Sequence, residues 1–410
     1  MRKRAGYIPE LDGFRVVMVF IVAWYHIWQQ SWLTPGLGLE PMVRAGYIAV
    51  DGTLLLSAFL LYLPWADRKD VPPVRDFYLK RAARVWPSFV FVTLAMLFLN
   101  AIPQKAYADP GALVKDLLMH LTLTFPFAPE TYIATPLGGA SWTIAVEFHF
   151  YLLFPWLTRL ARRHPAGTLC GMAALAAYFR GWCLWTRTDY AMVINQMANF
   201  LDVYALGMAC ALLFPVLRRL RDRMRTEERS IALQLIALAV LALSVVCFVF
   251  LLRAQAAESA ATLQRGQMMR RPLFALCFAG MVISLPFCWT PVRRLFGNPV
   301  TRFLSVISMN FYLLHQNIAV LLKSEAATVW LAKRGILFSE FDAPNVSYDL
   351  PWQLSYTALC FLLSLLAATA VTFLIEKPCA RLMLRGLRRR EAAAAQGQTA
   401  EPITEANPQE

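Results

Sequence analysis

The sequence is poor in charged side chains. Only 16% of its 410 residues are Asp, Glu, Lys or Arg, whereas soluble domains carry about 25%. Hydrophobic residues make up 58% of the chain, and its mean hydropathy is +0.47. The apolar residues fall in long runs that are separated by short basic or polar stretches. This distribution excludes one large soluble domain and is typical of a protein with several membrane spans.

Patterns that bind metal are also missing. The eight cysteines include no pair with CxxC spacing, and nearly all of them lie inside apolar runs. The five histidines are dispersed along the chain. The cysteines are therefore interpreted as small buried hydrophobic residues and not as disulfide or metal ligands. We expect no metal site and no tightly bound cofactor.

Acidic residues are outnumbered, with 26 Asp and Glu against 40 Lys and Arg, and the net charge is +14. A basic chain can indicate a nucleic-acid partner. However, no zinc finger, helix-turn-helix or basic-aromatic groove is visible, and the basic residues lie between apolar runs. The charge therefore indicates orientation in a membrane, and we expect no nucleic-acid binding.

Ten apolar runs are long enough to form transmembrane helices. We therefore expect an all-α, polytopic membrane protein with about ten transmembrane helices. Residues 1–390 are expected to form one integral-membrane domain, and residues 391–410 a disordered cytoplasmic tail. A short helix on the outer face is expected at Gly111–Leu123. The expected spans are approximately Phe14–Leu33, Ile48–Trp65, Val85–Ala101, Ser141–Leu160, Gly167–Trp185, Met197–Leu217, Ile231–Leu252, Pro272–Thr290, Phe303–Leu322 and Trp352–Leu374.

The basic residues of the short loops predict the orientation of these spans. If the N-terminus is cytoplasmic, 27 of the 40 Lys and Arg residues lie in cytoplasmic segments and 12 lie on the opposite side. The remaining one, Arg15, lies inside the first span. The positive-inside rule therefore predicts a multi-pass protein of the cell membrane with both termini in the cytoplasm.

The first span carries two polar side chains, Arg15 and His26, which are eleven residues apart. At about 100° per residue, eleven steps bring both onto one helix face, roughly 16 Å apart along the axis. His26 then lies near the middle of the bilayer, where a neutral imidazole can act as a general base. Two simpler explanations stay open: His26 could only hydrogen-bond a neighbouring helix, and Arg15 could be an interface anchor.

A basic pair, Arg81 and Arg84, lies where the third expected span leaves the cytoplasm. Residues three apart share a helix face. Two guanidinium groups at a membrane surface can bind phosphates through paired hydrogen bonds. By spacing alone, anchoring under the positive-inside rule is the favoured explanation of the pair.

Two later spans also carry polar groups. Glu147 lies inside the fourth span with His149 nearby, and it could orient a histidine, bind sugar hydroxyls or pair with an arginine of another span. In the ninth span, Asn310 and Asn317 share a face, with His315 between them in the sequence. These residues are interpreted either as the lining of a polar cavity or as a polar contact between helices, with the contact favoured.

Six stretches together resemble motifs of the acyltransferase-3 family of bacterial membrane acyltransferases. They are spread over most of the chain and stand in the family's order. The stretches are YIPELDGFRVVMVFIVAWYH, GYIAVDGTLLLSAFL, FYLKRAAR, SWTIAVEFHFYLLFP, FYLLH and IEKP.

The resemblance implies transfer of an acyl group, usually acetyl from acetyl-CoA, onto an acceptor hydroxyl that is often outside the cell. It implies essential roles for His26 and Arg15, and donor binding by Arg81 and Arg84. Glu147 is carried over as a third catalytic candidate. The expected partners are the lipid bilayer, acyl-CoA, and a carbohydrate or other cell-envelope acceptor.

The sequence departs from the family at Phe148, where a second carboxylate is common, and at Ala58, where the family has glycine. These departures leave the acceptor open. An alternative function is a multi-span transporter or lipid flippase without bond chemistry, although no internal repeat of the kind common in transporters is present. A non-catalytic membrane scaffold would leave the shared face of Arg15 and His26 unexplained.

Overall fold

The computed structural model describes residues 7–66, 73–224, 227–338 and 349–389. Every regular element in these ranges is helical. The expected tail, residues 391–410, lies outside them. The α-helices are α1 (Glu10–Ser31), α2 (Glu40–Ala45), α3 (Ala49–Tyr62), α4 (Val74–Met96), α5 (Pro110–Leu121), α6 (Pro129–Tyr132), α7 (Trp142–Arg163), α8 (Pro165–Thr186), α9 (Leu201–Arg223), α10 (Glu227–Ala256), α11 (Leu263–Ser284), α12 (Thr290–Phe296), α13 (Pro299–Lys323), α14 (Glu325–Ala332), α15 (Leu350–Val371) and α16 (Lys377–Met383).

Eight helical segments are long and apolar enough to cross a membrane, which confirms an all-α, polytopic membrane protein. They contain α1, α3, α4, α9, α10, α11, α13 and α15, several of them extended by adjoining turns. In the last of them, a π-helical turn at Thr372–Glu376 joins α15 to α16. Each of the eight corresponds to one of the ten expected spans.

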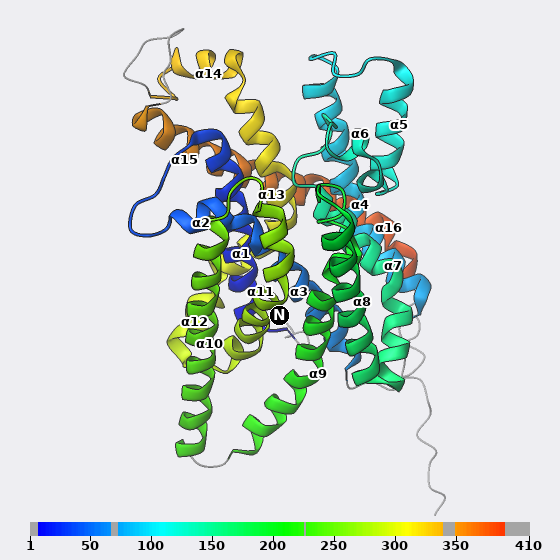
Figure 1. The fold of residues 1–410 in the computed structure, drawn as a ribbon, viewed down its shortest axis with the longest axis vertical. Coiled ribbons are helices and arrows are strands. Elements are labelled where there is room, and N and C mark those ends of the chain that lie inside the picture. The colour runs from blue at the N-terminus through cyan, green and yellow to red at the C-terminus, as the bar shows by residue number, and fades with distance from the viewer. Residues whose placement is uncertain (1–6, 67–72, 225–226, 339–348, 390–410) are drawn as a thin grey trace, which may run out of the picture.

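The other two expected spans correspond to α7 and α8. Each helix has 22 residues, but neither is among the eight, because polar side chains interrupt its apolar surface. Figure 1 shows α8 running beside α9, which is one of the eight, and α7 running beside α8. Their length and this packing favour ten crossings, although composition alone supports only eight.

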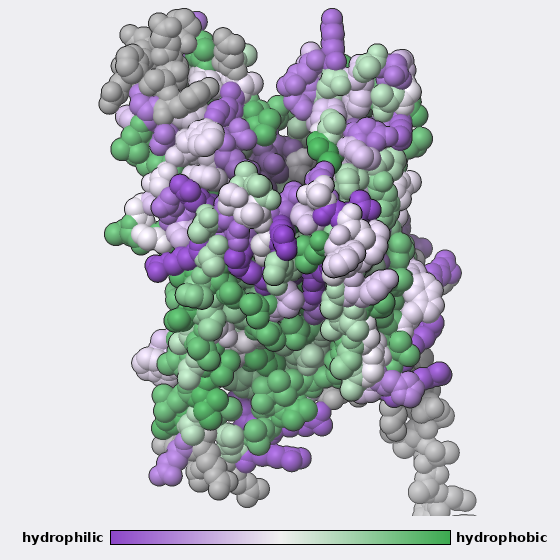
Figure 2. Space-filling view, viewed as in Figure 1, coloured by the Kyte–Doolittle hydropathy of each residue, from purple (hydrophilic) through white to green (hydrophobic). Residues whose placement is uncertain are grey.

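The two ends of the helical bundle carry different helices and differ in the polarity of their surfaces. Figure 1 shows α5, α6 and α14 gathered at one end, while α9 and α10 extend to the other. Figure 2 shows an apolar band over the lower part of this face and polar residues above it. The helix α5 confirms the short helix expected at Gly111–Leu123, and the side chain of Asp109 caps its N-terminus. The end that carries α5 and α14 therefore extends beyond the apolar band.

The helix α10 has an outward apolar surface that no other described helix covers. Ile236, Val246 and Phe250 on this helix are 61%, 64% and 72% exposed. In water a row of such side chains would be costly, whereas lipid tails solvate it. The lipid bilayer is therefore the environment that this surface fits.

Two buried ion pairs explain how charged residues are accommodated among the helices. Arg271 on α11 donates through Nε to Asp51 on α3 at 3.1 Å, and both residues are almost fully buried. Arg180 on α8 and Asp202 on α9 are 2.6 Å apart. Charges inside a membrane need such partners, and removing one partner of a buried pair would leave the other uncompensated.

The packing of α1 against α13 sets how the polar residues of these two helices face one another. The helix α13 begins with a capping box in which the Asn298 side chain accepts from the Thr301 N–H. Farther along, the rings of Phe20 on α1 and Phe311 on α13 stack with centroids 5.0 Å apart. This contact fixes the register in which the polar face of α13 meets α1.

We expect the basic stretch Arg218–Arg229, which includes the last turn of α9, to be cytoplasmic, because most of the basic loop residues fall on that side. In a variant without the eight native cysteines, Asp222→Cys should resist an impermeant thiol reagent added to intact cells. Glu130→Cys on α6, at the opposite end, should react with it. Both positions are exposed. The reverse labelling pattern would overturn the orientation.

Candidate functional site

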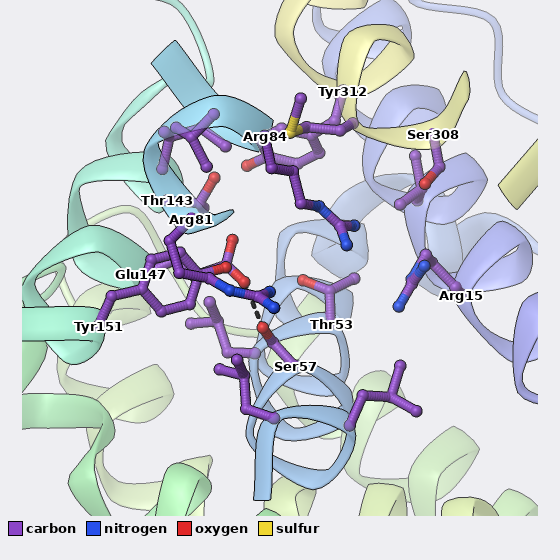
Figure 3. A pocket seen from close by; sticks show the side chains of 17 residues that line it. Arg15, Thr53, Ser57, Arg81, Arg84, Thr143, Glu147, Tyr151, Ser308 and Tyr312 are labelled. Atoms are coloured by element: carbon purple, nitrogen blue, oxygen red, sulfur yellow. Dashed lines mark hydrogen bonds between the residues drawn. The ribbon is translucent and has the colours of Figure 1, made fainter. Parts of the chain in front are cut away.

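A cavity of about 230 Å³ opens among α1, α3, α4, α7 and α13. Figure 3 shows side chains from several of these helices converging on it. Arg15, Ser57, Arg81, Arg84 and Glu147 all contribute to its lining. Four of the five site residues predicted from the sequence therefore lie on one cavity, although they come from three different helices.

The two arginines of α4 reach the cavity because they lie three residues apart on one face of the helix. Arg84 points toward the centre of the cavity (Figure 3). The Arg81 guanidinium lies 5.6 Å from the Phe77 ring and 5.7 Å from the Tyr151 ring, in cation–π geometry. Its buried Nε has no hydrogen-bond partner among the described residues. An arginine held by rings in this way keeps its hydrogen-bond donors available to a ligand.

Arg15 approaches the same cavity from α1. Its Nη1 donates to Ser305 Oγ at 3.4 Å, and that hydroxyl in turn donates to Asp12 Oδ1 at 2.7 Å. This chain of contacts ties the Arg15 side chain to α13. The cavity thus receives a third guanidinium group from a helix that the sequence places far from α4.

Among the described residues that line this cavity, Glu147 is the only carboxylate. It accepts a hydrogen bond from the Ser57 hydroxyl of α3 (Figure 3). One carboxylate can neutralise only one of the three guanidinium charges, so the cavity keeps a positive excess. Such a cavity favours an anionic ligand.

His26 does not line this cavity. It lies roughly 16 Å from Arg15 along the axis of α1. Its Nδ1 is 2.9 Å from Nε2 of His315 on α13. His315 is fully buried, whereas His26 is partly exposed. The candidate site therefore has two parts, an arginine cavity and a histidine pair.

Other polar residues noted in the sequence have local partners. Asn310 donates through Nδ2 to Thr372 Oγ1 and to Glu376 Oε2, each at 2.7 Å. It thus forms a polar contact between α13 and the end of the last span. His149 stacks on Phe127 with ring centroids 5.1 Å apart and does not line the cavity.

His315 was noted in the sequence but not predicted to be part of the site, and no sequence pattern singled out Ser57. Ser57 lies within the second-span motif GYIAVDGTLLLSAFL, which gave the only sequence signal for it. His315 and His26 are 289 residues apart in the chain. Only the packing of α1 against α13 brings the two imidazoles together.

Residues 8–377 match the model of a protein family described as an acyltransferase domain. The chain belongs to this acyltransferase-3 family. The match covers both parts of the candidate site and nearly the whole chain. It confirms the resemblance seen in the six sequence motifs.

Similar proteins carry related names. The chain is 32% identical over 179 residues to the acyltransferase MdmB of Streptomyces mycarofaciens, which covers 42% of this chain and 45% of that protein. It is 23% identical over 337 residues to a protein named "Putative O-acetyltransferase" in Staphylococcus aureus strain COL, covering 76% and 51%. It is 25% identical over 161 residues to the peptidoglycan O-acetyltransferase OatA of Listeria monocytogenes, covering 36% and 24%.

The alignments span about half the length of the first two of these relatives, and less of the third. No solved structure matches the chain. The family assignment therefore rests on sequence.

Proposed function

We propose that this protein transfers an acetyl or another short acyl group from acyl-CoA to a hydroxyl of a carbohydrate or other cell-envelope acceptor. In this proposal it is a multi-pass protein of the cell membrane with both termini in the cytoplasm. The observation that carries the proposal is the cavity with three arginines and one carboxylate, together with a partly exposed histidine roughly 16 Å farther along α1.

The positive charge of the arginine cavity indicates where the acyl donor binds. Burying three guanidinium groups beside a single carboxylate costs free energy in a membrane, because two positive charges lack a partner. A bound anion removes this cost. The phosphates of coenzyme A provide such an anion, and guanidinium forks bind phosphate oxygens in pairs. Arg81, Arg84 and Arg15 therefore hold the phosphates. Glu147 limits the positive excess and keeps the Ser57 hydroxyl in place.

The distance between the two parts of the site fits the rest of the donor. The acyl sulfur of coenzyme A is about thirteen bonds from the nearest phosphorus, which in an extended chain is roughly 15 Å. Arg15 and His26 are roughly 16 Å apart along α1. With its phosphates at the arginines, an extended donor brings its thioester beside His26.

The chemistry then uses His26 as a general base. The acceptor hydroxyl gives its proton to the imidazole while its oxygen attacks the thioester carbonyl carbon. The carbon–sulfur bond breaks, and the departing thiolate takes the proton back from the imidazolium. The products are the acyl ester and coenzyme A thiol. Arg15 serves in donor binding and not at the reacting carbonyl, because it lies a pantetheine length away.

The acceptor reaches His26 from the end of the bundle that carries α5 and α14. His26 lies in the second half of α1, on the side away from its N-terminus. The name of the Listeria relative, a peptidoglycan O-acetyltransferase, supports a cell-envelope carbohydrate as the acceptor class.

The proposal predicts that the purified protein releases coenzyme A thiol from labelled acetyl-CoA when a cell-envelope fraction is added. The label should appear in that fraction as an alkali-labile ester, because O-acyl esters are hydrolysed by base. Protein carrying His26→Ala provides the background rate. An intact thioester in the presence of every envelope fraction would instead favour a transporter without bond chemistry.

A further inference from the structure

We propose that His315 is a positioning residue that fixes the tautomer of His26 and presents His26 Nε2 as the proton acceptor. The inference rests on the proposed function, in which His26 is the base. It assigns a role to a buried histidine on a different helix.

The direction of the hydrogen bonds follows from a backbone carbonyl. His315 Nδ1 lies 3.2 Å from the carbonyl oxygen of Phe311, one turn earlier on α13. A carbonyl oxygen only accepts, so Nδ1 must carry the proton, and a neutral imidazole then has a lone pair on Nε2. That Nε2 is 2.9 Å from His26 Nδ1. His26 must therefore donate through Nδ1–H.

The consequence for His26 is a free lone pair on the opposite nitrogen. With its proton on Nδ1, neutral His26 has an unprotonated Nε2. The described side-chain contact of His26 is made through Nδ1, to His315, and leaves Nε2 without a described side-chain partner. The opposite tautomer would place a proton there and remove the base. The Phe311 carbonyl thus sets the state of His26 through His315.

The two histidines differ in solvent exposure, and this difference assigns them different roles. His315 is fully buried and cannot meet a substrate, whereas His26 is partly exposed. The Phe311 ring lies nearly parallel to the His315 ring, at an interplanar angle of 15° and a centroid distance of 6.0 Å. Phe311 also stacks on Phe20 of α1. These rings hold His315 in the orientation that its hydrogen bonds require.

During the reaction the pair also supports the charged form of His26. When Nε2 accepts the acceptor's proton, the imidazolium still donates through Nδ1–H to the neutral His315. Hydrogen bonds from a charged donor are stronger than those between neutral groups. No proton moves to His315 in this step, and the proton on Nε2 leaves with the thiolate. His315 is therefore needed even though it exchanges nothing with the substrates.

The kinetic test compares His315→Leu with His315→Gln. Leucine fills the site but cannot accept from Nδ1–H, so kcat should fall roughly 10–100-fold, as on loss of similar supporting contacts at metal sites, with KM for acetyl-CoA unchanged. Glutamine can donate to the Phe311 carbonyl and accept from His26 through its amide oxygen, so it should restore most of the kcat. Equal kcat for the leucine variant and the wild type would overturn the inference.

A matched control removes a buried hydrogen bond elsewhere between α13 and the last span. Thr372 is fully buried and accepts from Asn310 at 2.7 Å. Thr372→Val removes this contact without changing the shape of the residue. It should leave kcat near the wild-type value. A kcat loss as large as that of His315→Leu would show that any buried polar contact matters equally, which also overturns the inference.

A spectroscopic readout separates this inference from the proposed function. The chain has only five histidines, so ¹⁵N-histidine labelling gives few imidazole signals. The signals lost in His26→Gln identify His26. In the wild type they should report a proton on Nδ1, and in His315→Leu they should shift toward the Nε2–H form. An Nε2–H signal from wild-type His26 would overturn the inference even if acyl transfer is observed. Absence of transfer with an Nδ1–H signal would count against the proposed function alone.

Discussion

Replacing His26 with glutamine should remove most acyl transfer while the protein still inserts into the membrane. Loss of a general base typically lowers the rate by ~10²–10⁴-fold. Glutamine can still donate a hydrogen bond to His315, so it preserves the contact between α1 and α13. It cannot take a proton from the acceptor hydroxyl. The measurement is the rate of coenzyme A release by purified protein at saturating acetyl-CoA.

The glutamine variant also tests the simplest alternative for His26, a purely structural hydrogen bond between helices. If that were its only role, transfer by His26→Gln would stay near the wild-type rate. His149→Gln is a matched control, because His149 is also partly buried but stacks on Phe127 outside the cavity. This control should keep the wild-type rate and the wild-type unfolding temperature.

Most of the membrane-spanning helices could be predicted from the sequence. Long apolar runs are a strong signal because every backbone polar group in a bilayer must be satisfied within a helix. The signal was weakest for α7 and α8, whose polar residues lower their hydropathy. Arg180 illustrates the reason. It lies on a helix face buried against Asp202 of α9, and composition alone cannot show that such a charge has a partner inside the bundle.

The sequence predicted the individual residues of the site but not how they are grouped in space. Periodicity placed Arg15 and His26 on one face of α1, roughly 16 Å apart along its axis. It did not show that Arg15 groups with the α4 arginines and His26 with His315. Periodicity predicts which residues share one face of a helix. It does not predict which other helices pack against that face at each point along its length. Those neighbours are set by contacts between segments that are hundreds of residues apart.

The same limit applies to Glu147. Its position inside an expected span indicated a partner, and the sequence left a histidine, a sugar and an arginine as candidates. The structure gives it Ser57 as its hydrogen-bond partner and places it on the cavity with the three arginines. Since α3, α4 and α7 converge there, the choice among the three candidates depends on tertiary packing.

Changing both α4 arginines to glutamine should weaken acetyl-CoA binding by roughly 10²–10⁴-fold. The estimate comes from losing two charge-assisted contacts worth about 1.5–3 kcal/mol each. The double change of Arg81 and Arg84 to lysine should have a smaller effect of about tenfold, because lysine keeps the charge but lacks the planar fork. Affinities are measured by calorimetry on protein in detergent or in lipid nanodiscs.

The control for this experiment separates donor binding from membrane anchoring. Arg385 and Arg388 have the same spacing of three residues, are exposed, and do not line the cavity. Changing both to glutamine removes equal charge and should leave acetyl-CoA affinity unchanged. The second comparison uses S-acetylpantetheine, which lacks the phosphates. Its weaker binding should be nearly the same in the wild type and in the Arg81→Gln, Arg84→Gln variant, because the guanidinium forks then have no phosphate to hold. If acetyl-CoA affinity stays unchanged in a correctly inserted variant, these arginines are anchors, and the phosphates bind elsewhere in the protein.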